Sequence, residues 1–154
     1  MKVKKVVANL RTKAFDVLAG GRKFSFPFSR LKAPPTRKDP IVKLYIDPEV
    51  AWHGFTYVLA SGVEDTILLD QILDYLRDPE YVRKEILLHL FVRAERRIEE
   101  LGISKREIIR RMGSTPTQFY RLMDPRNVGK TIDQMLKLLA ALDCTVDIVV
   151  KNAA

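Results

Sequence analysis

Alternating apolar and polar positions run through the first 68 residues and predict β-strands. Residues 3–8 mix β-branched side chains with lysines, which is typical of a half-exposed or edge strand. Residues 14–18 and 22–26 predict a hairpin, because Gly20 and Gly21 supply the positive φ that a tight turn requires. Prolines make residues 33–40 a loop. Further strands are expected at residues 41–46, 55–59 and 66–68.

Helical spacing replaces this alternation after Leu69. Asp70 is expected to cap a short helix over residues 71–76. Asp78, Pro79 and Glu80 are a capping acid, a first-position proline and a first-turn acid, so a long helix is expected to begin there and to end before Gly102. Its buried stripe is expected to consist of Leu87, Leu90, Phe91, Ala94, Ile98 and Leu101.

Three capping boxes follow, in which a hydroxyl residue and a Glu or Gln three positions later satisfy each other's backbone donors. They are Ser104 with Glu107, Thr115 with Gln118, and Thr131 with Gln134. Each precedes apolar residues at helical spacing, so three further helices are expected. The last of these is expected to turn one face to the core, made of Ile132, Met135, Leu136, Leu139 and Leu142.

Alternation returns at the end of the chain. Residues 144–151 set Val146, Ile148 and Val150 against Thr145 and Asp147, which predicts a last strand. A lone strand is not stable, so this one is expected to pair with the N-terminal sheet or with a second chain. In the second case it would be a dimer contact.

Together these elements predict an α+β chain. A small antiparallel β-rich domain of unknown role is expected over residues 1–77, followed over residues 78–154 by an all-α bundle with a terminal β-strand. The single cysteine, Cys144, excludes an internal disulfide and favours a cytoplasmic location. No apolar run approaches the roughly 18 residues of a membrane span, so no membrane contact is expected.

The net charge of +8 favours an anionic partner. Residues 1–43 carry 12 Lys/Arg against two acids, residues 44–82 one against eight, and residues 83–154 fourteen against nine. Within the last block, the segment from Lys105 to Lys130 holds seven basic residues against Glu107 and Asp124. Most of that block's excess positive charge therefore lies in one short segment.

That segment overlaps the stretch ISKREIIRRMGSTPTQFYRLMD (residues 103–124), which resembles the Cro and phage-repressor (XRE-like) helix-turn-helix family. The resemblance covers roughly residues 83–143. Ser104 and Lys105 stand where the family has a small hydroxyl residue and glutamine, and Gly113 matches the turn glycine. The family's buried positions are matched by Ile108, Ile109, Met112, Phe119 and Leu122. The resemblance implies a four-helix DNA-binding domain.

The second motif helix is expected to read DNA. Thr115 as its cap and Phe119 and Leu122 on its inner face leave Thr117, Gln118, Tyr120 and Arg121 to solvent. The resemblance places Pro116, Thr117 and Arg121 at the base-facing positions, although a proline limits readout there to apolar contact. Lys105, Thr115 and the loop from Arg126 to Lys130 are expected to contact phosphate. The alternative is a four-helix bundle used for protein contacts.

The first 80 residues loosely resemble a small β-rich bacterial domain of uncharacterised function. The cues are the strand, strand, glycine turn and strand at its start and the later Leu69-Asp70-Gln71 helix. That resemblance implies an architecture and no chemistry. A basic stretch could extend a DNA footprint, but a solvated surface is the favoured interpretation; it consists of Arg22, Lys23, Arg30, Lys32, Arg37 and Lys38.

Catalytic and metal-binding patterns are absent from the sequence. His53 and His89 are the only histidines, and neither has a second ligand at metal spacing. Asp70, Asp74 and Asp78 recur every four residues, but helix starts and surface positions explain them better than paired catalytic carboxylates. The sequence has no glycine-rich phosphate loop and no nucleophile elbow. We therefore expect neither an enzyme nor a metal or cofactor site.

The sequence therefore predicts a transcription regulator that binds double-stranded operator DNA as a homodimer in the cytoplasm. The alternative is an antitoxin-like module that neutralises a partner toxin, because type II antitoxins also use this helix-turn-helix. The β-rich domain or the terminal strand would then contact the partner protein by adding a strand to its sheet.

Overall fold

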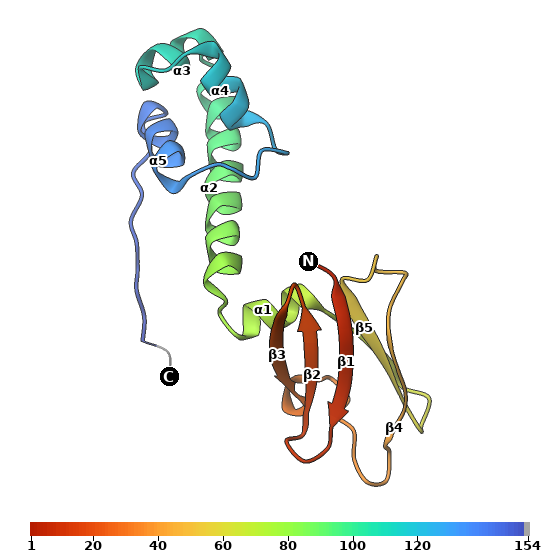
Figure 1. Cartoon of the computed structure of the whole chain (residues 1–154). Coiled ribbons are helices and arrows are strands. Elements are labelled where there is room, and N and C mark those ends of the chain that lie inside the picture. Colours follow the sequence, from red (N-terminus) through yellow and green to blue (C-terminus); the bar gives the residue numbers. More distant parts are fainter. Residues whose placement is uncertain (153–154) are drawn as a thin grey trace. The chain divides into compact units, whose positions relative to one another are not determined.

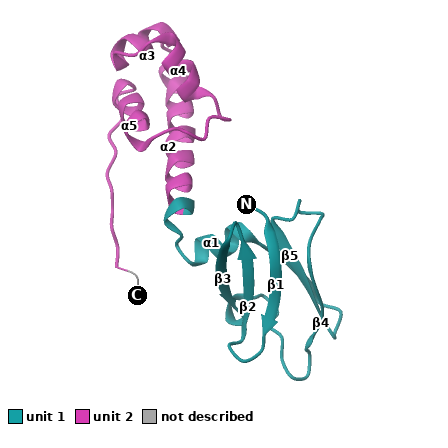
Figure 2. Ribbon diagram, in the orientation of Figure 1, with its two compact units in different colours: residues 1–81 teal, residues 82–154 magenta. Residues whose placement is uncertain are grey.

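A computed structural model describes residues 1–152, which fall into two compact units (Figure 2). The first unit covers residues 1–81, and the second begins at Val82. The boundary therefore lies just inside the long helix that starts at Pro79, whereas the sequence placed it at residue 78. Within the described residues the fold is mixed α and β, with two three-stranded antiparallel sheets and five α-helices (Figure 1).

Six strands form the two sheets of the first unit. One sheet has the order β1-β2-β3, from Val3–Asn9, Ala14–Ala19 and Arg22–Pro27. The other has the order β4-β5-β6, from Ile41–Ile46, Gly54–Leu59 and Glu64–Leu68. The strands predicted for this unit are confirmed, although β6 begins two residues earlier than expected. Gly20 (φ 56°) and Gly21 (φ 74°) form the predicted hairpin turn between β2 and β3.

Phe15 joins the two sheets in one core. Its side chain is fully buried on β2, and its ring lies 4.8 Å from that of Phe55 and 5.5 Å from that of Tyr57, both on β5. A third ring, Phe28, lies 5.0 Å away and comes from a one-turn 3-10 helix, Phe28–Arg30, which the sequence did not predict. These aromatic contacts stabilise the pair of sheets as a single folded domain.

Helix α1 (Leu69–Tyr75) packs Leu69, Ile72 and Leu73 into this core. The prediction that Asp70 caps it is wrong, because the cap residue is Leu68 and Asp70 lies in the first turn. The Gln71 side chain accepts a hydrogen bond from the Leu68 N–H (2.8 Å), which satisfies a donor at the helix start without an acidic cap.

Helix α2 (Pro79–Leu101) begins as predicted. Asp78 accepts a hydrogen bond from the Tyr81 N–H (3.2 Å) and also forms an ion pair with Arg22 of β3. The sequence placed Arg22 in a basic stretch interpreted as a solvated surface. Its ion pair with buried Asp78 gives it a structural role in the first unit.

Three further helices, α3 (Lys105–Met112), α4 (Pro116–Met123) and α5 (Ile132–Ala141), complete the second unit. Their core with α2 contains Leu87, Leu90, Phe91, Ala94, Ile108, Phe119, Leu122, Met135, Leu138, Leu139 and Leu142. One predicted core position is wrong: Leu136 is 37% exposed, and Leu138 is buried in its place. Leu136 and Leu138 flank the stripe of Ile132, Met135, Leu139 and Leu142 on opposite sides, and both fit the helix period, so spacing alone did not distinguish them.

The predicted last strand is not formed in this chain. Residues 144–152 have no regular secondary structure, and neither sheet of the first unit includes them. The described residues therefore form no last strand, and pairing with a second chain stays a prediction. Ala153 and Ala154 lie outside the described residues.

Candidate nucleic-acid interface

Two helices and the turn between them form the candidate interface (Figure 1). Ser104 caps α3 by accepting on Oγ a hydrogen bond from the Glu107 N–H (3.1 Å). The helix ends at Gly113, whose φ of 61° is the left-handed conformation that glycine adopts without strain. Thr115 then caps α4, because its Oγ accepts from the Gln118 N–H (3.2 Å). The predicted helix, glycine turn and helix are thus confirmed as local structure.

Helix α4 buries one face and exposes the other. Phe119 and Leu122 are 2% and 5% exposed, as expected for residues that anchor the helix. The residues of α4 and its cap that the sequence assigned to DNA contact are exposed, namely Thr115, Pro116, Thr117, Gln118, Tyr120 and Arg121. The polar side chains of α4 therefore face solvent together and are held on an anchored helix.

The Gln118 side chain is only partly available to a ligand. Its Oε1 accepts a hydrogen bond from the Ser114 hydroxyl (3.0 Å) and a longer one from the Thr115 N–H (3.4 Å). The amide nitrogen has no hydrogen-bond partner among the described residues. Gln118 can therefore act as a donor to a base or phosphate but has already used its acceptor to close the capping box.

Lys105 and Tyr120 connect α3 with α4. The Lys105 ammonium lies 5.5 Å from the centre of the Tyr120 ring, within the range of a cation–π contact. Tyr120 is 53% exposed, and its ring also lies edge-on to Phe119 at 5.6 Å. The predicted phosphate contact on α3 and a predicted contact on α4 thus lie on one continuous surface.

Acidic side chains neutralise several of the basic residues between Lys105 and Lys130. Glu107 pairs with Arg110 (2.6 Å) and Arg111 (3.2 Å), and hydrogen bonds from these two guanidinium groups lower the Glu107 pKa to about 2. The arginines engage the Glu107 carboxylate, so only half of the expected capping box forms: Ser104 accepts from the Glu107 N–H, but the Glu107 side chain does not return to the Ser104 N–H. Asp124 likewise pairs with Arg126 at 3.2 Å, and this ion pair lowers the Asp124 pKa. Arg126 stays 90% exposed and open to a second contact.

Lys130 does not lie on the surface, where the predicted phosphate contact requires it. It is 8% exposed, and its ammonium donates a hydrogen bond to the Asp124 carbonyl oxygen (2.6 Å). A buried ammonium with an internal partner has little surface to offer a phosphate, so we leave Lys130 out of the proposed contacts.

Three exposed basic residues of this segment have no ion pair within residues 1–152: Lys105, Arg106 and Arg121. Arg106 was not singled out from the sequence, because its neighbours offered no reason to rank it above the other arginines. What distinguishes it is the pairing of Glu107 with Arg110 and Arg111, which only the structure shows. The uncompensated charge of the α3–α4 surface is therefore concentrated on these three side chains.

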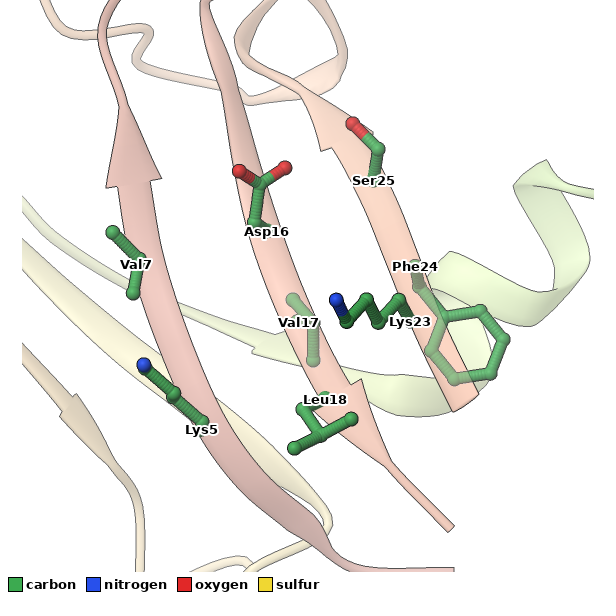
Figure 3. Close-up of a pocket in the computed structure, with 8 residues that line it drawn as sticks. All are labelled: Lys5, Val7, Asp16, Val17, Leu18, Lys23, Phe24 and Ser25. Atoms are coloured by element: carbon green, nitrogen blue, oxygen red, sulfur yellow. The ribbon is translucent and has the colours of Figure 1, made fainter. Parts of the chain in front are cut away.

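A shallow hollow lies on the outer face of the β1-β2-β3 sheet (Figure 3). Lys5 and Lys23 lie on either side of Leu18, with which both pair across the strands. Asp16 beside them accepts a hydrogen bond from Asn9 (2.9 Å), so it is already engaged. The hollow contains no group of metal ligands or nucleophiles, and its open sheet surface suits a protein contact better than chemistry.

Neither a metal site nor a membrane span emerges from the described part of the chain. No three His, Cys, Asp or Glu side chains in it lie close enough together to hold a metal ion. None of its helices has the length and apolarity required to cross a membrane. Comparisons of the chain with protein-family models, curated proteins and solved structures find no match.

Proposed function

We propose that the protein is a sequence-specific DNA-binding regulator of transcription, acting in the cytoplasm, that contacts operator DNA through α3 and α4. Arg121 carries this proposal: it is exposed in the second turn of α4 and has no ion pair among the described residues. An arginine without an ion pair, on the exposed face of an anchored helix, can donate two hydrogen bonds to O6 and N7 of a guanine in the major groove.

The other exposed residues divide into two roles in this proposal. Thr117 and the free amide nitrogen of Gln118 supply further contacts to base edges, and Pro116 offers an apolar contact. Lys105, Arg106, Thr115, Tyr120 and Arg126 contact phosphates, which fixes position on the duplex without reading sequence. The choice of basic residues follows the ion pairs within the chain, because only basic side chains that are unpaired or highly exposed are assigned to DNA.

The protein is proposed to bind as a homodimer. A two-fold dimer places two copies of α4 in successive major grooves, so half-sites would be centred about one helical turn, roughly 34 Å, apart. The two-fold symmetry of the dimer gives the operator an inverted-repeat sequence.

The experiment that tests this function is selection of bound duplexes from a random library at about 150 mM salt, where non-specific contacts are weak. We expect an inverted repeat containing a guanine in each half-site. A protein with Arg121→Ala, selected in parallel, should lose the preference at that guanine and keep the rest of the sequence. Failure to enrich any sequence with the unaltered protein would refute the proposal.

The second candidate function is an antitoxin-like module that neutralises a partner toxin, and the observation that favours it is the hollow of the first unit. Val7 is 44% exposed there, and with Leu18 and the flanking lysines it forms a mixed apolar and basic surface suited to an acidic protein partner. The gene beside this one distinguishes the two functions, because a short toxin-like reading frame there favours the antitoxin.

A further inference from the structure

The segment after α5, residues 145–152, is exposed and has no regular secondary structure. Cys144 makes the last backbone hydrogen bond, from its N–H to the Leu139 carbonyl oxygen (2.9 Å). Beyond it no backbone hydrogen bond is formed with any described residue. The three consecutive apolar residues Ile148, Val149 and Val150 are 81%, 77% and 88% exposed. We call residues 145–152 the tail.

The tail has the amino-acid composition of a β-strand, but its described residues do not form the backbone hydrogen bonds of a strand. Five of its residues are β-branched, which favours extended backbone; these are Thr145, Val146, Ile148, Val149 and Val150. Unpaired backbone groups next to exposed apolar side chains make an edge that readily adds to another strand. Neither described sheet includes the tail as a strand.

We propose that the tails of two copies of this chain pair as antiparallel strands across a two-fold axis. A strand that pairs with its own copy must be complementary to itself when reversed, and the charges of the tail meet this condition. With Val149 opposite Val149 of the second copy, Asp147 lies opposite Lys151, twice per dimer, and Ile148 lies opposite Val150. Opposite charges directly across an antiparallel pair stabilise it, and like charges destabilise it.

Neighbouring registers are less complementary. With Ile148 opposite itself, Asp147 lies opposite Val149, and both charges lose their partners. With Ile148 opposite Val149, the alternating apolar faces of the two strands point to opposite sides of the ribbon. The register centred on Val149 alone among these three combines matched charges with a shared apolar face of Ile148 and Val150.

The apolar face of such a ribbon requires cover, because two strands alone are marginally stable in water. The second unit has further exposed apolar side chains on α2: Leu88 and Val92, one helical turn apart, are 57% and 52% exposed. Burial of these side chains together with Ile148 and Val150 would supply the apolar area that the dimer needs.

A charge exchange tests the pairing and its register in sedimentation equilibrium without DNA, so the result does not depend on the proposed DNA binding. Asp147→Lys alone and Lys151→Asp alone each place like charges opposite one another and should weaken dimerisation about tenfold. The double variant, Asp147→Lys with Lys151→Asp, restores opposite charges and should recover the dimer. Lys137→Asp, which makes the same charge change as Lys151→Asp at an exposed position of α5, is the control and should have little effect.

A double variant no tighter than the single variants would overturn the charge pairing, and an unaltered protein that stays monomeric would overturn the dimer. Disulfide trapping tests the register independently, in a Cys144→Ser background. Val149→Cys should cross-link two chains under mild oxidation faster than Ile148→Cys, because only residues opposite their own copies approach within disulfide range. Faster linkage through Ile148 would overturn the register, and linkage through neither would overturn the pairing.

Discussion

The ammonium of Lys130 lies 4.4 Å from the centre of the Phe91 ring, which joins the loop after α4 to the core face of α2. The same ammonium holds the Asp124 carbonyl oxygen at the end of α4. Burial lowers the Lys130 pKa, as expected for an ammonium removed from water. A residue that looks like a phosphate contact in the sequence is thus a structural link between two helices.

Lys130→Ala is expected to lower the free energy of unfolding by about 1–3 kcal/mol, because it removes a cation–π contact and a charged hydrogen bond. Urea unfolding measures the effect. Lys137→Ala on the exposed side of α5 is the matched control, with an expected change within about 0.5 kcal/mol. Since Lys130 is buried, DNA affinity under conditions where both proteins are folded should not change; a loss comparable to that of Lys105→Ala would contradict this assignment.

Thr115→Ala should lower the free energy of unfolding by about 0.5–2 kcal/mol, because the Thr115 hydroxyl oxygen accepts the Gln118 N–H that starts α4. Thr117→Ala changes the same residue type two positions later, where the side chain is exposed and caps nothing. It should leave unfolding nearly unchanged and weaken DNA binding. Equal losses of stability in the two variants would show that Thr115 does not act as the cap.

The pKa of Glu107 near 2 predicts part of the acid sensitivity of the protein. Its ordinary value of 4.5 applies in the unfolded chain, so the ion pairs with Arg110 and Arg111 stabilise the fold fully above pH 4.5. This contribution is lost as the pH falls from 4.5 to about 2. Glu107→Gln should therefore lose less stability over that range than the unaltered protein does. Urea midpoints at a series of pH values measure this difference, and parallel curves for the two proteins would contradict the contribution of the Glu107 ion pairs.

Local signals in the sequence were sufficient for much of the fold. Paired Gly20 and Gly21 fixed one turn, and the hydroxyl caps at Ser104, Thr115 and Thr131 located three helix starts, because these motifs satisfy backbone groups within a few residues. The polar face of α4 was also predictable, since Phe119 and Leu122 define the opposite face.

The remaining features depend on contacts between distant residues. The burial of Lys130 depends on Phe91, thirty-nine positions earlier, and the role of Arg22 on Asp78. Glu107 leaves its capping box because Arg110 and Arg111 compete for it. The tail has the pattern of a strand, but a strand requires a neighbour, and pattern alone does not identify that neighbour.

Base reading by Arg121 is measured by the affinity of the protein for the selected operator and for every single-base variant of that operator. Arg121→Ala should cost about 1–3 kcal/mol on the operator and abolish discrimination at one position in each half-site. Lys105→Ala is the matched control: it should weaken all sequences alike and reduce the salt slope by about one unit. If Arg121→Ala keeps both the affinity and the preference at every position, α4 does not read DNA as proposed.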